Sequence, residues 1–306
     1  MSDENLSGII VIDKPQNYTS FDVVAVMRGI TKQKKVGHTG TLDPLATGVL
    51  PILLGSATKA QNLLPDSDKE YIAEFLLGIE TDTQDITGRV LNKSKVSVTK
   101  AELESVLEKF KGKIKQIPPM YSAVKKDGKR LYDLARSGIT VDRPSREVTV
   151  KELELISFNE ESYKVSIRVY CSKGTYIRTL CSDIGNVLLC GATLTSLRRT
   201  MACGFNIDKS ITLDQANSYG ANLLFDEKLI KTDKLFLNYE RVNISLAQTT
   251  RFKNGGSLMI ERTNLSNKAD ELFNDQLIRI YSNDDLFLGL AYVDLNDKSL
   301  KVKKRF

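Results

Sequence analysis

Residues 36–48 read Val36-Gly-His-Thr-Gly-Thr-Leu-Asp-Pro-Leu-Ala-Thr-Gly48 and contain three glycines, the chain's single histidine and an aspartate followed by proline. A residue before proline is driven toward extended backbone, so Asp43 lies on a stiff loop. The glycines allow another backbone segment to approach closely. Such a loop can present one carboxylate at a fixed place. Asp-Pro is also a common helix start, so the residues alone fit equally well with Asp43 capping a helix that begins at Pro44.

A second unusual position is Arg178, at the end of Lys173-Gly-Thr-Tyr-Ile-Arg178. A helix is predicted over residues 176–189, and Arg178 lies in its first turn. An arginine in the first turn opposes the helix dipole, so it needs a compensating partner. A bidentate ion pair with Asp43 would supply one and would lower the pKa of that carboxyl. The alternative is an arginine on the surface, and both interpretations stay open at this point.

Several chemistries are excluded by what the sequence lacks. The chain has 306 residues, with 41% hydrophobic and 27% charged residues, which is typical of a soluble globular protein. A single histidine, His38, rules out every zinc motif that needs two, and the four cysteines form no CxxC pair. GxSxG, GxGxxG and GxxxxGK[ST] motifs do not occur. We therefore expect an enzyme that works without a metal, a nucleotide or any other cofactor.

The cellular location follows from the same composition. No apolar stretch is long enough for a membrane span, and the polar, acidic start MSDENLSG does not resemble a signal peptide. Scattered cysteines are typical of reduced thiols. We expect a cytoplasmic protein with no membrane contact.

The positive charge is concentrated in three places. The net charge is +6, and residues 111–150 hold ten Lys/Arg against four Asp/Glu. A second cluster comprises Arg28, Lys32, Lys34 and Lys35, and a third comprises Lys301, Lys303, Lys304 and Arg305. Clustered cations of this kind are typical of proteins that contact phosphates, although each cluster alone fits a solvated surface equally well.

The hydrophobic pattern predicts an α+β fold with a mixed, mainly antiparallel sheet, because strands and helices do not alternate regularly. Strands are predicted at residues 8–13, 71–79, 148–156, 163–171 and 194–202. Helices are predicted from an N-cap at Ser20, from a capping box at Thr99 to Glu102, over residues 131–136 and over residues 176–189. Residues 208–234 are polar and helical in character. Residues 241–306 then predict a small all-β module, with strands at 256–261, 277–282 and 287–294.

Together these stretches resemble the TruB family, the tRNA pseudouridine-55 synthases of bacterial type. The resemblance is ordered along residues 8–200 and weaker beyond. The matching motifs are Gly8-Ile-Ile-Val-Ile-Asp-Lys-Pro15, Thr19-Ser-Phe-Asp-Val-Val24, residues 36–51, Gly55-Ser-Ala-Thr-Lys59, Lys69-Glu-Tyr71, Thr81-Asp-Thr83, Gln116-Ile-Pro-Pro-Met-Tyr-Ser-Ala-Val-Lys125, Gly128-Lys-Arg-Leu-Tyr132, Cys171-Ser-Lys-Gly-Thr-Tyr-Ile-Arg178 and Leu197-Arg-Arg199.

The resemblance implies a role for individual residues. Asp43 matches the family's catalytic aspartate, and Arg178 matches the arginine paired with it. Tyr71 matches the aromatic residue that stacks on the target base. The remaining implied positions are Tyr176 and Leu197 in the uracil pocket, His38 beside the flipped nucleotides, Lys14 and Pro15 as structural support, and Lys125, Lys126, Lys129 and Arg130 on the RNA backbone.

The resemblance also implies an architecture and an activity. It predicts a pseudouridine-synthase catalytic domain over residues 1–235, a basic loop at about 118–146 that closes on RNA, and a PUA-like module over residues 236–306. The implied reaction isomerises uridine 55 in the T-loop of tRNA to pseudouridine by base flipping and an aspartate-dependent exchange of the glycosidic bond. It needs no metal and no cofactor, and whether Asp43 acts as nucleophile or base stays open. The implied partner is tRNA, through its T-arm and its acceptor end, and we expect a monomer.

Two other classes of function are weighed against this one. An RNA-binding chaperone would use the same basic surfaces without chemistry, and the two roles can coexist. A nucleotidyl- or phosphotransferase built on the GHTG segment is disfavoured, because the chain has no phosphate loop and no acidic metal cluster.

Overall fold

The apolar run near the N-terminus forms β1 (Gly8–Lys14), which is buried on both faces in the computed structural model. The structure describes residues 6–64, 67–122, 124–126, 128–221 and 225–306. Successive side chains of a strand point to opposite faces. Ile10 and Ile12 therefore pack with α1 (Ser20–Thr31), whereas Ile9 and Val11 pack with Leu235 and Phe236 on the other side. Burial on both faces explains why the run is continuous rather than alternating.

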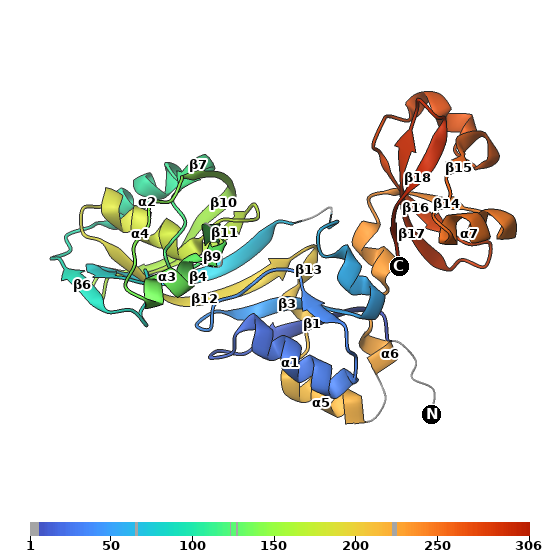
Figure 1. Cartoon of the computed structure of the whole chain (residues 1–306). Helices are drawn as coiled ribbons and strands as arrows, with labels where there is room; N and C mark the ends of the chain where they lie inside the picture. The colour runs from blue at the N-terminus through green and yellow to red at the C-terminus, as the bar shows by residue number, and fades with distance from the viewer. Residues whose placement is uncertain (1–5, 65–66, 123, 127, 222–224) are drawn as a thin grey trace.

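A nine-stranded sheet organises the larger part of the chain (Figure 1). Its order is β1-β3-β12-β4-β11-β10-β7, with β2 paired to β3 and β13 paired to β12. Its pairs are antiparallel except the short parallel contact between β3 and β12. The mixed, mainly antiparallel α+β fold is thus confirmed. The strands are β2 (Val36–His38), β3 (Thr47–Leu54), β4 (Lys69–Leu77), β7 (Gly112–Gln116), β10 (Arg146–Asn159), β11 (Lys164–Cys171), β12 (Ala192–Ala202) and β13 (Phe205–Asn206).

Helices cover the sheet in two groups. The α2 (Lys100–Glu108) and α4 (Ile177–Val187) helices share one core with β4, β11 and β12, while α1 and α5 (Leu213–Ala221) cover β1 and β3. The capping box at Thr99 is confirmed. The N-cap predicted at Ser20 is wrong by one residue: Thr19 is the cap and Asp22 closes the box, because Ser20 already has its hydroxyl on Leu42. No described helix combines the length and apolarity that crossing a lipid bilayer needs.

Short elements complete the larger part. They are η1 (Gly55–Ala60), the pair β5 (Ile79–Thr81) and β6 (Val90–Lys93), η2 (Ile207–Lys209), α6 (Phe225–Lys228) and η3 (Thr232–Phe236). The polar segment predicted to be helical over residues 208–234 therefore consists of several short helices.

The loop of residues 36–48 joins the sheet through Gly48. Gly48 has a φ of +103°, and a Cβ atom built there would lie 2.2 Å from the carbonyl oxygen of Arg199. Gly48 is paired with Arg199 across the β3–β12 contact. Only glycine permits this approach, so the loop that carries Asp43 is anchored tightly against β12.

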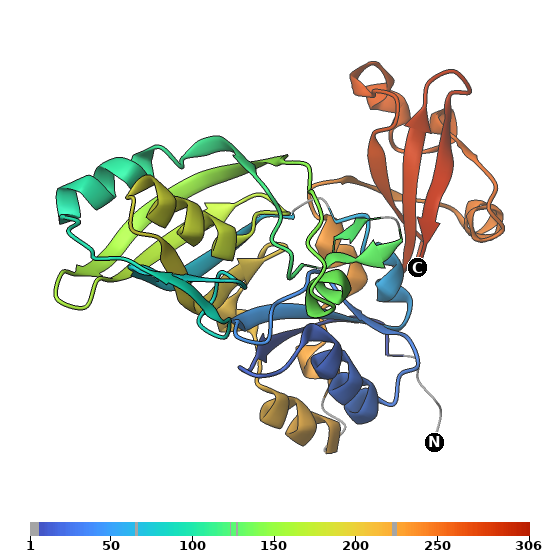
Figure 2. The ribbon, with the colours of Figure 1, turned by 60° about the vertical axis from the view of Figure 1, so that its left-hand side comes forward.

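The predicted basic loop contains some regular structure. The hairpin of β8 (Lys125–Lys126) and β9 (Lys129–Arg130) leads into α3 (Leu131–Arg136), which confirms the short predicted helix (Figure 2). Arg143 donates from Nη1 to the carbonyl of Pro118 at 3.1 Å. That contact ties the end of the loop to its beginning.

The C-terminal part forms a second, five-stranded sheet in the order β14-β16-β17-β18-β15, with its own core. The strands are β14 (Glu240–Asn243), β15 (Leu258–Met259), β16 (Leu277–Tyr281), β17 (Phe287–Asp294) and β18 (Ser299–Arg305). The basic end of the chain is a paired strand, in which Lys301 lies 2.6 Å from Asp294. The predicted C-terminal β module is present.

Two details of this module differ from the sequence prediction. It also contains α7 (Leu246–Lys253), which begins with a capping box from Ser245 to Gln248 and buries Thr249 and Phe252. Of the strand predicted over residues 256–261, only residues 258–259 form a strand, which is β15. The chain then turns into η4 (Ile260–Arg262) and η5 (Ser266–Glu271).

Candidate active site

Asp43 and Arg178 meet in the structure although 135 residues of sequence (178 − 43) separate them. Nε of Arg178 lies 3.0 Å from Oδ2 of Asp43. Asp43 comes from the loop before β3, and Arg178 from the first turn of α4. No helix begins at Pro44. Instead, the backbone N–H of Ala46 donates to the carbonyl of Asp43 at 3.0 Å in a tight turn. The helix-cap alternative for Asp43 is therefore wrong.

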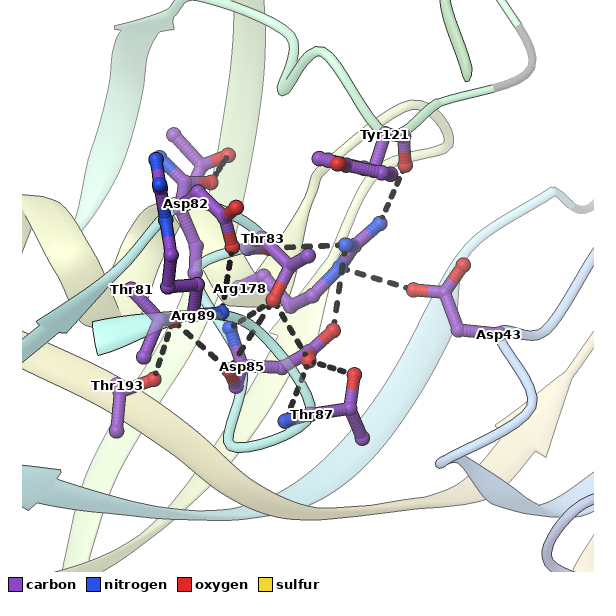
Figure 3. Close-up of polar contacts among 12 residues, drawn as sticks. Asp43, Thr81, Asp82, Thr83, Asp85, Thr87, Arg89, Tyr121, Arg178 and Thr193 are labelled. Carbon is purple, nitrogen blue, oxygen red and sulfur yellow. Dashed lines mark hydrogen bonds and ion pairs between the residues drawn. The ribbon is translucent and has the colours of Figure 1, made fainter. Parts of the chain in front are cut away.

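All three nitrogens of the Arg178 guanidinium have partners, and the side chain is only 6% exposed (Figure 3). Nη1 donates to the carbonyl of Thr83 at 3.0 Å and lies 3.3 Å from Oδ2 of Asp85, and Nη2 donates to the carbonyl of Tyr121 at 2.8 Å. The surface alternative for Arg178 is wrong. The predicted bidentate pair with Asp43 is also wrong, because both terminal nitrogens bind other groups and only Nε is left for Asp43.

Asp85 is the partner that the sequence interpretation missed. Its side chain is 7% exposed, and its Oδ1 accepts bonds from Thr83 Oγ1 at 2.9 Å, Thr87 N at 3.0 Å and Thr87 Oγ1 at 2.5 Å (Figure 3). The turn after β5 thus fixes this carboxylate from one side, and Arg178 fixes it from the other. The motif Thr81-Asp-Thr83 pointed to this turn, but the sequence does not show which acid of the turn faces inward.

Burial raises the pKa of Asp43, while the charge of Arg178 opposes that shift and the carboxylate of Asp85 adds to it. The sequence argument expected a net lowering of this pKa. It was wrong in sign because the desolvation of a carboxylate outweighs one monodentate contact. The side chain is still 40% exposed, so the carboxylate remains reachable from the mouth of the site. A reachable carboxylate with a perturbed pKa is typical of a catalytic group.

A shallow depression surrounds this carboxylate, and in the described conformation it has no room for an enclosed water molecule. It is lined by Asp43, Leu45, Ala46, Asp85, Arg178, Leu194 and Leu197. The structure thus brings three predicted residues, Asp43, Arg178 and Leu197, to one place. Its walls combine apolar side chains with two ion pairs that share Arg178, so a flat ligand that opens the depression would lie against a charged group.

Lys14 lies beneath the loop and is fully buried. Its Nζ donates to the carbonyls of Pro15 at 2.9 Å, Tyr18 at 2.6 Å and Pro44 at 3.5 Å. Burial lowers the pKa of Lys14 to about 8, although the charge of Asp43 opposes the shift. Lys14 and the Pro15 carbonyl therefore hold the turn next to Asp43 in place.

Tyr71 and His38 flank the site without lining the depression. Tyr71 lies on β4 and is 6% exposed, and burial raises the pKa of its hydroxyl to about 12 against the charge of Arg199. His38 accepts a bond at Nδ1 from the N–H of Gly40 at 3.2 Å, and burial lowers the pKa of its ring. His38 is therefore neutral near pH 7 and suited to positioning rather than to carrying charge.

The remaining predicted residues are less closely joined to Asp43. Tyr176 caps α4 and exchanges two hydrogen bonds with Gln116, at 3.0 and 3.3 Å. In the basic hairpin, Lys126 donates to the carbonyl of Asp142, Arg130 donates to the Tyr132 hydroxyl, and Lys129 is exposed. The side chain of Lys125 lies outside the described residues. Among the side chains that the structure describes, no group of three or more His, Cys, Asp or Glu residues is placed to hold a metal ion.

Comparison with known proteins places this chain in a family. Residues 28–177 match the model of the TruB family pseudouridylate synthase N-terminal domain, and residues 178–240 match the model of the tRNA pseudouridylate synthase B C-terminal domain. The tRNA pseudouridine synthase B of Clostridium tetani is 43% identical over 287 residues, which cover 94% of this chain and 95% of the relative. That of Clostridioides difficile is 40% identical and covers 97% and 98%.

Solved structures agree with this assignment. A chain of a Cbf5–Nop10–Gar1 complex superposes with a TM-score of 0.72 at 25% identity and covers 98% of this chain and 85% of its own. A chain of an H/ACA RNP bound to a substrate RNA containing 2′-deoxyuridine has the same fold, with a TM-score of 0.72, 23% identity and coverage of 99% and 86%. The fold and the matches together define the class of protein, a pseudouridylate synthase, which is an isomerase. Within that class, the chain belongs to the TruB family.

Proposed function

We propose that this enzyme converts uridine 55, in the T-loop of tRNA, to pseudouridine, with Asp43 as the catalytic residue. The observation that carries the proposal is the exposed edge of the Asp43 carboxylate, fixed by Arg178 in a shallow depression. The names of the relatives, which act on tRNA, support the substrate.

The reaction moves one bond within the substrate. The N1–C1′ bond breaks, the uracil turns, a C5–C1′ bond forms, the proton on C5 is lost and N1 gains one. Nothing is oxidised or reduced, so one ionised carboxylate beside the ribose is sufficient as either nucleophile or base. Arg178 supports this step by holding the carboxylate, while Asp85 and the Thr83 and Tyr121 carbonyls hold Arg178.

The uridine must leave its stack to reach Asp43, because C1′ and C5 are hidden within a folded loop. Unstacking costs a few kcal/mol, part of which stacking on an aromatic ring returns. In this proposal the ring of Tyr71 stacks on the uracil, and Leu197 and Tyr176 enclose it. His38 positions the neighbouring nucleotides. The Tyr71 side chain is buried in the described conformation. A base can therefore stack on its ring only after the side chains that cover the ring have moved.

Backbone contacts complete the proposed complex. Lys125, Lys126, Lys129 and Arg130 bind phosphates, and the loop of residues 118–146 closes on the T-arm. Residues 1–235 act as the catalytic domain. The module of residues 236–306 contacts the acceptor end of the tRNA. We place a monomer in the cytoplasm, where tRNA is the substrate.

Release of tritium from C5 of [5-³H]uridine in a T-arm stem-loop tests the proposal. Wild type and Asp43→Asn are compared in buffer with EDTA, and a stem-loop with cytidine at position 55 is the substrate control. We expect release only by wild type and only from the uridine substrate, while both proteins bind the stem-loop equally. Release by Asp43→Asn would refute the role of Asp43, and release from the cytidine control would refute the choice of uridine 55. Tight binding without any release would favour the chaperone alternative.

A further inference from the structure

The second basic cluster, Arg28, Lys32, Lys34 and Lys35, has no role in the site described above. All four residues are exposed. None of their side chains forms an ion pair with another described residue, unlike Lys301 or Arg168, which are each held by carboxylates. Four neighbouring cations without acidic partners repel one another, so an anionic partner that binds them is favoured.

Helical spacing aligns this cluster with an exposed aromatic ring. Phe21, Ala25 and Arg28 recur at intervals of four and three residues and therefore lie along one face of α1, and Lys32 is the C-cap residue directly after its last turn. Phe21 is 61% exposed at the start of that face. The opposite face is buried through Val23, Val24 and Met27, and α5 packs beside it (Figures 1 and 2). At 1.5 Å per residue, the outer face runs about 16 Å from Phe21 to Lys32.

The aromatic end of this face adjoins the candidate active site. The rings of Phe21 and His38 pack edge to face, with 5.5 Å between their centroids. Ser20, the residue before Phe21, accepts a bond from Leu42 N at 2.8 Å and donates to Leu42 O at 3.3 Å. The first turn of α1 is thereby fixed to the loop that carries Asp43.

We propose that the outer face of α1 and the residues after it bind the substrate RNA beside the target nucleotide. Phe21 stacks on an unpaired base, and Arg28, Lys32 and Lys34 neutralise phosphates. We name this surface the α1 tract and define it by these four residues. The one acid beside Phe21, Asp22, is engaged in the capping box with Thr19. The inference rests on the proposed function, because it takes tRNA as the partner.

The charge component is tested by the salt dependence of binding. Arg28→Gln, Lys32→Gln and Lys34→Gln are combined in one variant and compared with a matched variant, Lys93→Gln, Lys95→Gln and Lys109→Gln. The control removes three exposed lysines that also lack ion pairs but lie at the end of β6, in the loop after it and directly after α2 (Figure 1). Both variants carry the same net charge, so only the position of the lost charges differs.

The probe is an unmodified full-length tRNA transcript, with its dissociation constant measured between 50 and 300 mM salt. Each phosphate contact contributes about 0.7–0.9 to the slope of log K against log salt, so the tract variant should lose about 2–3 from that slope. We expect at least tenfold weaker binding at physiological salt for the tract variant and a change of less than twofold for the control. Equal slopes for the two variants would overturn the proposal.

The stacking contact of Phe21 is tested with a second pair of variants. Phe21→Ala should weaken binding about fivefold or more, whereas Leu91→Ala, which removes a 58% exposed apolar side chain from β6, should not. Equal affinity for Phe21→Ala and wild type would refute the stacking contact. If the proposed function is wrong, the wild-type protein will release no tritium. The comparison of binding affinities does not depend on that result.

Discussion

Nη1 of Arg178 lies 3.3 Å from Oδ2 of Asp85, and both side chains are less than one-tenth exposed. The contact places a second carboxylate behind the arginine that holds Asp43. One buried and one partly exposed acid thus share one guanidinium, and the Thr83 and Thr87 hydroxyls satisfy the remaining oxygen of Asp85. Removing one member of such a set leaves a buried charge without its partner, which is costly.

Asp85→Asn should therefore impair catalysis through Arg178, which the Asp85 carboxylate holds in place. The amide loses the charge that anchors Arg178, and its N–H₂ group can face the guanidinium donors. A displacement of Arg178 by about 1 Å would lower turnover about 10²-fold, and loss of the buried pair would cost about 3 kcal/mol of stability. Single-turnover tritium release and urea unfolding measure the two effects.

Asp82→Asn is the control for that variant. Asp82 belongs to the same turn and accepts a bond from Arg89 N at 2.8 Å, but it is exposed and makes no contact with Arg178 (Figure 3). A loss of turnover as large as that of Asp85→Asn would show that the turn itself matters, rather than its buried carboxylate.

The pH dependence of turnover should report the raised pKa of Asp43. A nucleophile or a base must be ionised, so the rate falls as the pH drops through this pKa, with a midpoint above the ordinary value of 3.8. The charge of Arg178 opposes the upward shift. Arg178→Met should consequently move the acid limb to higher pH, in addition to lowering the maximal rate.

Arg178→Lys separates charge from geometry in the same experiment. It keeps a cation near Asp43 but cannot bind Thr83, Asp85 and Tyr121 together. We expect a reduced rate with an acid limb closer to that of wild type. If Arg178→Met and Arg178→Lys have identical acid limbs in the pH dependence of turnover, that limb does not report the ionisation of Asp43.

The positions of several strands and the loop position of Asp43 could be predicted from sequence, whereas the order of the strands and the details of the ion pair could not. Alternating burial marks β4 and β11, because half-buried strands impose that pattern, whereas the pattern of β12 is irregular. The pairing of Asp43 with Arg178 was a hypothesis from a helix-dipole argument. Its monodentate form depends on where the Thr83 and Tyr121 carbonyls lie, which no local pattern encodes.

Asp85 and α7 show two ways in which sequence patterns were insufficient. The turn of residues 81–88 holds Asp82 and Asp85, and only the folded turn distinguishes the exposed acid from the buried one. The α7 helix begins with a readable capping box at Ser245, but the neighbouring turns and strands dominated the interpretation of that region. The roles of Tyr71, Tyr176 and the basic hairpin remain predictions, because each needs the RNA in place.

Lys14 should make stability depend on pH in alkaline solution. Its pKa is about 8 in the folded protein against an ordinary 10.5, so between these values the unfolded chain binds more protons than the folded one. Stability from this group therefore rises as pH increases from 8 to 10.5 and is lost as pH falls through 8. The unfolding free energy of wild type minus that of Lys14→Met should rise by on the order of 3 kcal/mol across this window.

Urea unfolding at pH 7.5, 9 and 10 checks this expectation for Lys14→Met. Lys93→Met, at an exposed position of β6, serves as the control. A difference that stays constant or falls with increasing pH would show that the Lys14 ammonium is not desolvated in the folded protein.

Gly48→Ala should destabilise the protein where the catalytic loop meets the sheet. Alanine would hold a φ of +103°, and its Cβ atom would lie 2.2 Å from the Arg199 carbonyl oxygen and 2.8 Å from the Arg199 nitrogen. These are backbone atoms of a central strand that cannot move aside cheaply. We expect a loss of about 2–4 kcal/mol in the free energy of unfolding.

Gly29→Ala is the control, because nothing lies within 4 Å of a Cβ atom there and the residue is exposed within α1. It should gain about 1 kcal/mol from helix propensity. If the close approach to Arg199 also fixes Asp43, Gly48→Ala will lose turnover at temperatures where the protein is still folded, whereas Gly29→Ala will keep it. Equal stability of the two variants would show that β3 and β12 can separate at Gly48 without cost.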